Sequence, residues 1–199
     1  MGEQIHVYVD IRFLNKWTWL TVVGWFLGLT VAEEVTAWVF PSAEHALLGS
    51  SPIYYAVFGA VLGFLQWWSI RDRISRSFGW VIATAGGLFL AGWLVNKQLY
   101  ILEPFATFFQ NFPLLVDIVI GAVLGFSQYL VVKKKLAYSY AWPLLLPVIW
   151  TISTGIMGTP NVWLQLVGMF TFGLSTAVAM EGLSRLYSHQ ESPPNKAGI

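Results

Sequence analysis

The sequence predicts an all-α fold: an integral membrane bundle of six transmembrane helices, arranged as three hairpins. The first observation is composition, because 56% of the 199 residues are hydrophobic, 11% are charged and the mean hydropathy is +0.63. A soluble domain carries about 25% charged residues, so lipid is the expected surrounding of most of this chain. The second observation is a series of apolar runs separated by short loops. The third is a glycine-rich segment that occurs twice in almost the same form.

The repeated segment begins at Gly59 (Gly-Ala-Val-Leu-Gly-Phe-Leu-Gln-Trp) and again at Gly121 (Gly-Ala-Val-Leu-Gly-Phe-Ser-Gln-Tyr), 62 residues later. Both copies have glycines four residues apart, a spacing that lets helix backbones approach closely in lipid. A third, more divergent copy is expected around Gly173. The glycines predicted to pack helices together are Gly24, Gly28, Gly59, Gly63, Gly121, Gly125 and Gly173.

The first hairpin is expected over residues 17–70, with spans at about 17–40 and 53–70. Pro41 ends the first span because proline cannot continue a helix without losing a hydrogen bond. Residues 1–16 alternate between apolar and polar in places, which predicts a short strand or a segment at the membrane interface. Their charged residues, with no apolar run before them, argue against a secretory signal peptide.

The second hairpin is expected over residues 78–132, with spans at about 78–95 and 114–132. Asp117 falls in the first turn of the later span, where a negative charge suits the positive end of the helix dipole. The segment between the spans, residues 98–113, is rich in aromatic residues. It is expected to lie in the interface or against the bundle.

The third hairpin is expected over residues 141–187, with spans at about 141–157 and from 162 to 180 or beyond. Pro147 lies inside the earlier span, where a proline removes a hydrogen bond and kinks the helix. The polar tail, residues 188–199, is expected to be disordered.

All three hairpins are expected to form one transmembrane domain, residues 1–187. Cations are concentrated in alternate loops, which predicts that these loops and both termini face the cytoplasm. The cations that support this orientation are Arg71, Arg73, Arg76, Lys133, Lys134, Lys135, Arg185 and Lys196.

The chain contains 11 tryptophans. Trp19, Trp80 and Trp142, at spacings of 61 and 62 residues, are expected near the beginnings of the first, third and fifth helices. Because indole rings concentrate at membrane–water interfaces, the tryptophans near span ends are expected among the headgroups. They are Trp17, Trp19, Trp67, Trp68, Trp80, Trp142 and Trp163.

Two hairpins share the pattern GxxxGxxQW, a basic turn and a helix that begins with tryptophan. The pattern covers residues 59–80 and 121–142, with Tyr129 in the place of the first tryptophan in the second copy. It resembles a group of multi-span membrane proteins of cyanobacteria and green filamentous bacteria. The resemblance transfers no activity, and it implies only a location in a bacterial plasma membrane or a thylakoid membrane.

Four polar residues are candidates for a shared site near the basic loops. Gln66 and Gln128 lie on the same helix face as the repeated glycines, and Thr176 and Glu181 hold related positions in the third copy. The simpler interpretation is a set of hydrogen bonds between helices, each contributing about 0.6 to 2 kcal/mol. The alternative is a polar pocket, whose amide oxygens could ligate the magnesium of a pigment.

Glu33 and Glu34 are two carboxylates on an apolar run. They lie about 24 Å along the first span, near the far edge of a hydrocarbon core of about 30 Å. We expect them among the headgroups or beside Lys97. If they were buried, they would indicate proton or cation handling.

The sequence contains no recognisable set of catalytic residues. The chain has no cysteine and only three histidines, all in predicted loops or tails, so metal and haem sites are not expected. The glutamate pair resembles that of CAAX-processing intramembrane proteases, but Trp38 stands where those proteins have arginine. No basic patch for nucleic acid is present.

The function predicted from sequence is therefore non-catalytic. The leading hypothesis is a subunit, scaffold or assembly partner of a membrane complex, with the lipid bilayer and other membrane proteins as partners and no required cofactor. The alternative is a small protein that binds or transports a solute or an ion through a polar pocket in the bundle. Binding of a pigment or lipid has no sequence signature of its own.

Overall fold

A computed structural model describes residues 9–41, 51–74, 78–101, 113–133, 136 and 138–190. All regular structure in these residues is helical, which confirms the predicted all-α class. The helices are α1 (Ile11–Val39), α3 (Pro52–Ile70), α4 (Gly79–Ile101), α6 (Pro113–Val132), the short 3₁₀ helix η1 (Ser139–Ala141), α7 (Trp142–Met157) and α8 (Val162–Gln190).

Local chemistry explains where several helices begin. The carboxylate of Asp10 accepts a hydrogen bond from the backbone N–H of Phe13 and caps α1. The hydroxyl of Ser51 caps α3 in the same way, and Pro52 occupies the first turn, where its missing N–H costs nothing. Pro147 lies inside α7, which continues through it to Met157.

The predicted boundaries need three corrections. Residues 11–16 belong to α1, so a strand is wrong there, and residues 1–8 lie outside the described part of the chain. The helix begins early because Asp10 caps it. The last helix, α8, continues to Gln190, past the predicted start of the tail, and residues 191–199 lie outside the description. Of the aromatic segment 98–113, residues 98–101 continue α4, Pro113 begins α6 and the remainder is not described.

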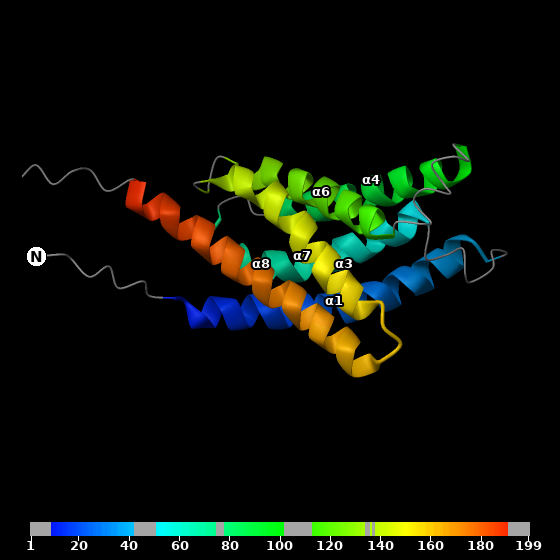
Figure 1. Cartoon of the computed structure of the whole chain (residues 1–199), viewed down its shortest axis with the longest axis horizontal. Coiled ribbons are helices and arrows are strands. Elements are labelled where there is room, and N and C mark those ends of the chain that lie inside the picture. The colour runs from blue at the N-terminus through cyan, green and yellow to red at the C-terminus, as the bar shows by residue number, and fades with distance from the viewer. Residues whose placement is uncertain are drawn as a thin grey trace, which may run out of the picture.

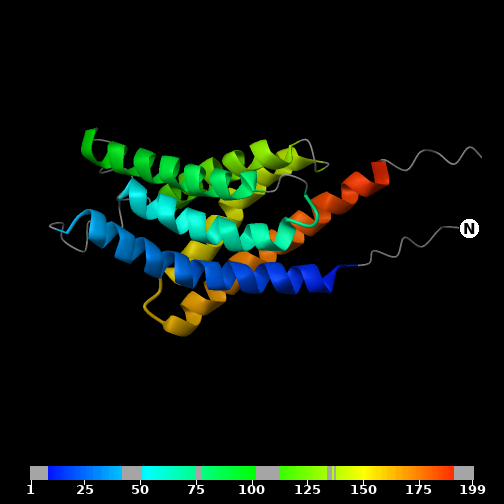
Figure 2. The same ribbon diagram turned by 180° about the vertical axis from the view of Figure 1, so that it is seen from behind.

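The six long helices form a closed ring in which each packs on the next and α8 packs on α1 (Figure 1). Seen from behind, α1, α3 and α4 lie side by side (Figure 2). The start of α1, the end of α8 and the turns after α3 and α6 gather at one end of the ring. This end, which carries Arg71, Arg73 and Lys133, is called the basic end below.

Within the described residues, five helices are long and apolar enough to cross a membrane, and the apolar part of α4, Gly79–Val95, is shorter. Helix α7 has 16 residues whereas α1 has 29, so the turn between α7 and α8 stops short of the far end of α1 (Figure 1). Among the described helices, α7 and α8 therefore do not cover the far part of α1.

Glycines bring neighbouring backbones close together at several seams of the ring. A Cβ on Gly59 would lie 2.8 Å from the carbonyl oxygen of Thr84, and one on Gly121 would lie 2.6 Å from Cα of Pro147. On α8, a Cβ on Gly173 would lie 3.0 Å from the carbonyl oxygen of Thr18. Close contacts of the same kind surround the other predicted packing glycines, Gly24, Gly28, Gly63 and Gly125.

Candidate functional site

Three tryptophans fill the centre of the ring, toward its basic end. Trp17 on α1, Trp80 at the start of α4 and Trp142 at the start of α7 each expose 1% or less of their surface. The ring centroids of Trp17 and Trp80 are 5.8 Å apart, and those of Trp80 and Trp142 are also 5.8 Å apart. The tilted and edge-on contacts between these rings are favourable aromatic geometries. We call this set the tryptophan layer.

Each indole N–H in the tryptophan layer donates a hydrogen bond to a polar side chain of another helix. Trp80 Nε1 donates to Gln66 Oε1 of α3 over 3.1 Å, and Trp142 Nε1 donates to Gln128 Oε1 of α6 over 3.0 Å. Both glutamines expose only 2% of their surface. A buried indole N–H without an acceptor would carry a desolvation penalty. The glutamines remove that penalty inside the bundle.

The same glutamines also donate to the helix that precedes them in the chain. Gln66 Nε2 donates to Thr21 Oγ1 of α1 over 3.4 Å, and Gln128 Nε2 donates to Thr84 Oγ1 of α4 over 2.9 Å. The hydroxyl of Thr84 in turn donates a hydrogen bond to the carbonyl oxygen of Trp80. Each amide therefore connects three helices, because it has both a donor and an acceptor.

Thr176 takes the equivalent place for Trp17. Its hydroxyl oxygen on α8 accepts a hydrogen bond from Trp17 Nε1 over 2.9 Å. The hydroxyl proton is directed to the carbonyl oxygens of Phe172 and Gly173 in the same helix. Thr176 therefore connects only two helices.

The tryptophan layer corrects the expectation for the tryptophans. Trp17, Trp80 and Trp142 are not among the headgroups but at the centre of the ring, and Trp17 rather than Trp19 joins the other two. Trp19 is 57% exposed on the outside of α1. A signal for the buried pairs is present in the sequence, because each glutamine is followed 14 residues later by its tryptophan.

Of the four polar candidates, the structure brings Gln66, Gln128 and Thr176 together in one buried layer. Their polar atoms are taken up by the indoles and threonines just described, so this level of the bundle is filled by side chains. Glu181 lies more than one turn further along α8 and has different partners.

Glu181 takes part in an ionic cluster at the basic end. Its carboxylate, whose side chain is 8% exposed, accepts a hydrogen bond from the guanidinium of Arg73 over 2.7 Å. Arg73 also pairs with Asp10, and the backbone N–H of Asp10 donates to Glu181 over 3.3 Å. The guanidinium lies 4.0 Å from the ring centroid of Phe13, a cation–π geometry. We call Asp10, Arg73 and Glu181 the ionic clamp, which joins the turn after α3 to both α1 and α8.

The surroundings of Asp10 in the ionic clamp lower the pKa of its carboxyl group. The backbone N–H of Phe13, which donates to the carboxylate, holds the pKa of Asp10 below its ordinary value of 3.8, and the charge of Arg73 acts in the same direction. Partial loss of water around the carboxylate opposes this shift without reversing it.

A small cavity of about 190 Å³ lies beside the clamp. Its walls are mainly apolar, and Ile70 and Met180 line it one helical turn beyond Gln66 and Thr176. The cavity therefore lies between the tryptophan layer and the basic end.

The carboxylates on α1 are exposed. Glu33 and Glu34 both lie on the outer surface of the bundle, so a buried carboxylate pair, the condition for proton handling, is not formed. The side chain of Lys97, their expected partner, lies outside the described residues.

In the described part of the chain, no group of three or more histidine, cysteine, aspartate or glutamate residues lies close enough together to hold a metal ion. No protein-family model, curated protein or solved structure matches this chain.

Proposed function

We propose that this chain is an integral membrane protein that acts as a non-catalytic scaffold or subunit of a membrane complex. The membrane is bacterial, a plasma membrane or a thylakoid. Support for a bilayer comes from the apolar length of the helices and from two exposed tryptophans of α1, Trp19 and Trp38. They lie 19 residues apart, or about 28 Å along a helix, close to the hydrocarbon thickness of about 30 Å that separates two aromatic belts.

We also propose that the bundle consists of three repeated hairpins with both termini in the cytoplasm. The repeat is supported by the two matching pairs, Gln66 with Trp80 and Gln128 with Trp142, whose members are equally far apart in the chain. The orientation is supported by the cations of the basic end, since positive loops are retained in the cytoplasm.

The observation that favours a scaffold over a transporter is the tryptophan layer. A transport path along the axis of the ring would have to pass Trp17, Trp80 and Trp142, whose rings are in contact and whose N–H groups are all bonded. None of these tryptophans lines the cavity beside the clamp, whose walls are mainly apolar, with Arg73 and Ser184 as the polar residues, unlike a solute site with several convergent polar groups. A rigid, filled bundle with a large apolar exterior suits a role in packing against other membrane helices.

The test is affinity purification of the tagged chain from its own membranes. In a mild detergent, we expect a second membrane protein to co-purify in constant ratio, and a harsh detergent should separate the two. Resistance to carbonate extraction measures membrane integration independently. Recovery of the chain alone, at the mass of a monomer with no co-purifying protein in the mild detergent, would contradict the scaffold proposal.

Orientation has its own test. A fluorescent protein fused after Ile199 should fluoresce in bacteria, whereas alkaline phosphatase fused at the same place should be inactive. The reverse pair of results would place the basic end outside the cytoplasm and refute the orientation without affecting the scaffold.

A further inference from the structure

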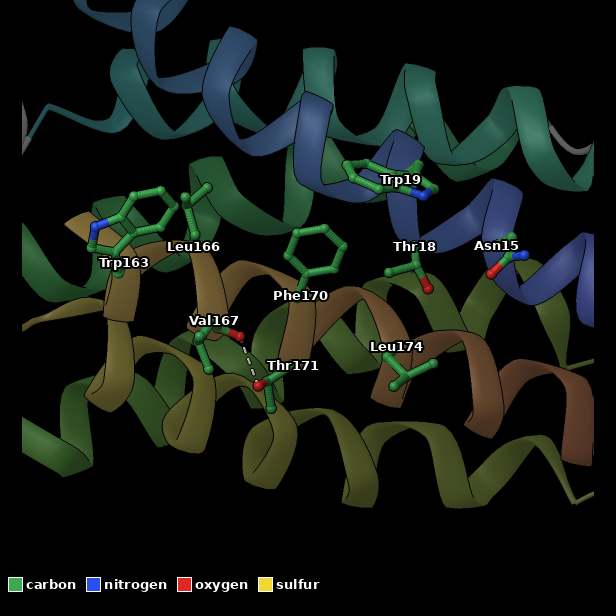
Figure 3. A pocket seen from close by; sticks show the side chains of 9 residues that line it. All are labelled: Asn15, Thr18, Trp19, Trp163, Leu166, Val167, Phe170, Thr171 and Leu174. Carbon is green, nitrogen blue, oxygen red and sulfur yellow. Dashed lines mark hydrogen bonds between the residues drawn. The ribbon is translucent and has the colours of Figure 1, made fainter. Parts of the chain in front are cut away.

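A groove of about 620 Å³ runs along the outside of the bundle between α1 and α8 (Figure 3). Its volume falls within the range of about 300–1,000 Å³ that is common for ligand pockets. Trp163 marks one end of the groove, and Asn15 and Thr18 mark the other, toward the basic end. Between these ends the edge-to-face contact of Trp19 with Phe170 joins the two helices, with ring centroids 4.9 Å apart.

The groove is long, narrow and apolar for most of its length. From Trp163 to Leu174, the α8 residues that line it extend over about 16 Å. One leaflet of a bilayer has a hydrocarbon depth of about 15 Å, half of the full core. The groove is therefore the length of one acyl chain lying along the protein surface.

Apart from Thr171, whose hydroxyl donates to the carbonyl oxygen of Val167 in its own helix, the polar residues that line the groove lie at the end nearest the basic end. The side chain of Asn15 is exposed there, whereas Thr18, only 7% exposed, keeps its hydroxyl oxygen buried. A ligand with polar atoms at this end would therefore meet the exposed amide of Asn15, which can both donate and accept hydrogen bonds.

Two cations extend this polar end beyond the groove. Arg12 and Lys16 are exposed on α1, on the side of the helix that carries Asn15 and Trp19. Neither cation forms an ion pair with another described residue; the carboxylate of Asp10 nearby is engaged by Arg73. An apolar channel that ends in free positive charge complements an amphipathic anion.

We propose that the groove between α1 and α8 binds one phospholipid with an anionic headgroup, taken from the leaflet that faces the basic end. The headgroup lies against Arg12, Asn15 and Lys16, and one acyl chain follows the groove toward Trp163. This proposal rests on the proposed membrane location but not on the scaffold role.

A second copy of the chain is a poorer occupant of the groove. Two copies with the same orientation in a membrane would bring their basic ends together, so Arg12 and Lys16 of each copy would repel those of the other. A lipid phosphate removes this positive charge instead of doubling it.

The test measures lipid binding to the full chain, purified and delipidated in detergent, by native mass spectrometry with added phosphatidylglycerol or phosphatidylcholine. We expect one phosphatidylglycerol to remain bound at collision energies that remove phosphatidylcholine. Arg12→Gln and Lys16→Gln should each weaken phosphatidylglycerol binding about fivefold. Lys133→Gln, which removes an exposed cation at the same end but away from the groove, should leave binding unchanged.

A second pair of variants tests the apolar channel. Val167→Trp places a large ring in the groove and should weaken binding of phosphatidylglycerol at least tenfold, whereas Val178→Trp adds the same ring to an exposed position of α8 outside it and should have no effect. Equal binding of the two lipids, equal effects of the two tryptophan variants, or a dimer that Val167→Trp dissociates would each overturn the lipid site. If carbonate extracted the chain from membranes, the result would instead refute the membrane location itself.

Discussion

Neighbouring helices of the ring are joined by two different kinds of hydrogen bonding, and we call each contact between two neighbouring helices a seam. At α3 and α6, a buried glutamine accepts from the tryptophan of the following helix and donates to a threonine of the preceding helix. At α8, Thr176 accepts from Trp17 but turns its own proton back into α8. In α4, Thr84 stands four residues after Trp80 and accepts a hydrogen bond from Gln128 of α6. In α7, Leu146 stands four residues after Trp142, so this position offers no hydroxyl to α8.

The difference shows how the first and last helices are held together. A primary amide can satisfy two neighbours at once, whereas a hydroxyl in a helix competes with its own backbone for a single proton. The α1–α8 seam instead gains the ionic clamp at the basic end, and beyond Gly173 it opens into the groove lined by Trp19 and Phe170. The closing seam is thus held at one end and open along its side.

The largest difference between the seams is expected for glycine substitutions. Gly121→Ala should destabilise the protein by about 3 kcal/mol, because the new Cβ would lie 2.6 Å from Cα of Pro147 and backbone atoms cannot move away cheaply. Gly173→Ala should cost less, about 1 kcal/mol, since its nearest atom is 3.0 Å away.

Unfolding in mixed micelles of mild detergent and dodecyl sulfate measures both glycine variants. Gly155→Ala, which meets nothing within 4 Å, is the matched control and should be neutral or slightly stabilising. If Gly121→Ala and Gly155→Ala unfolded at the same detergent fraction, the close approach of α6 and α7 would be wrong.

The second comparison concerns the polar residues of the layer. Gln128→Leu keeps the volume but leaves the N–H of Trp142 without an acceptor and Thr84 without its donor, so we expect a loss of about 2 kcal/mol in the free energy of unfolding. Thr176→Val removes a single acceptor and should cost about 1 kcal/mol. The near-ultraviolet circular dichroism of the packed indoles should change for both variants. Equal losses for the two variants would show that the hydrogen bond from Gln128 to Thr84 contributes nothing to stability.

The ionic clamp provides the third comparison. Arg73→Gln removes the guanidinium that lies 2.7 Å from the buried carboxylate of Glu181, and because the arginine is one-third exposed we expect a loss of only about 1 kcal/mol. Glu181→Gln in the same chain should restore part of that loss, which a double-mutant cycle measures. Arg71→Gln, at an exposed pair with Asp72, is the control. Strictly additive losses would show that Arg73 and Glu181 are not coupled.

The sequence predicted the helices well because apolar length and breaking residues are local properties. The span predicted for 53–70 corresponds to α3, and that predicted for 114–132 corresponds to α6. The early start of α1 was missed because a single side chain, Asp10, caps it there. Hydropathy does not register such a cap.

The centre of the ring could be predicted only in part. The two glutamines were singled out by their repeat, but the sequence does not say which of Trp17 and Trp19 points inward, since that depends on how α1 is rotated against α8. The clamp depends on Asp10, Arg73 and Glu181, which are far apart in the chain and meet only after the ring closes. Glu181 was grouped with the two glutamines in the sequence, whereas in the structure it contacts Arg73 and the backbone N–H of Asp10.

The smallest expected effect is a dependence on pH of the stability of the contact between α1 and α8. The pKa of Asp10 is lower in the folded chain than its ordinary value of 3.8, so the charged form favours folding. Its contribution is therefore complete above pH 3.8 and is lost as the pH falls through the lower, folded value. Between pH 5 and pH 3, the melting temperature in detergent should fall more for the wild type than for Asp10→Asn, whereas Asp72→Asn should follow the wild type. Parallel curves for all three proteins would mean that Asp10 neither caps α1 nor stabilises the clamp through its charge.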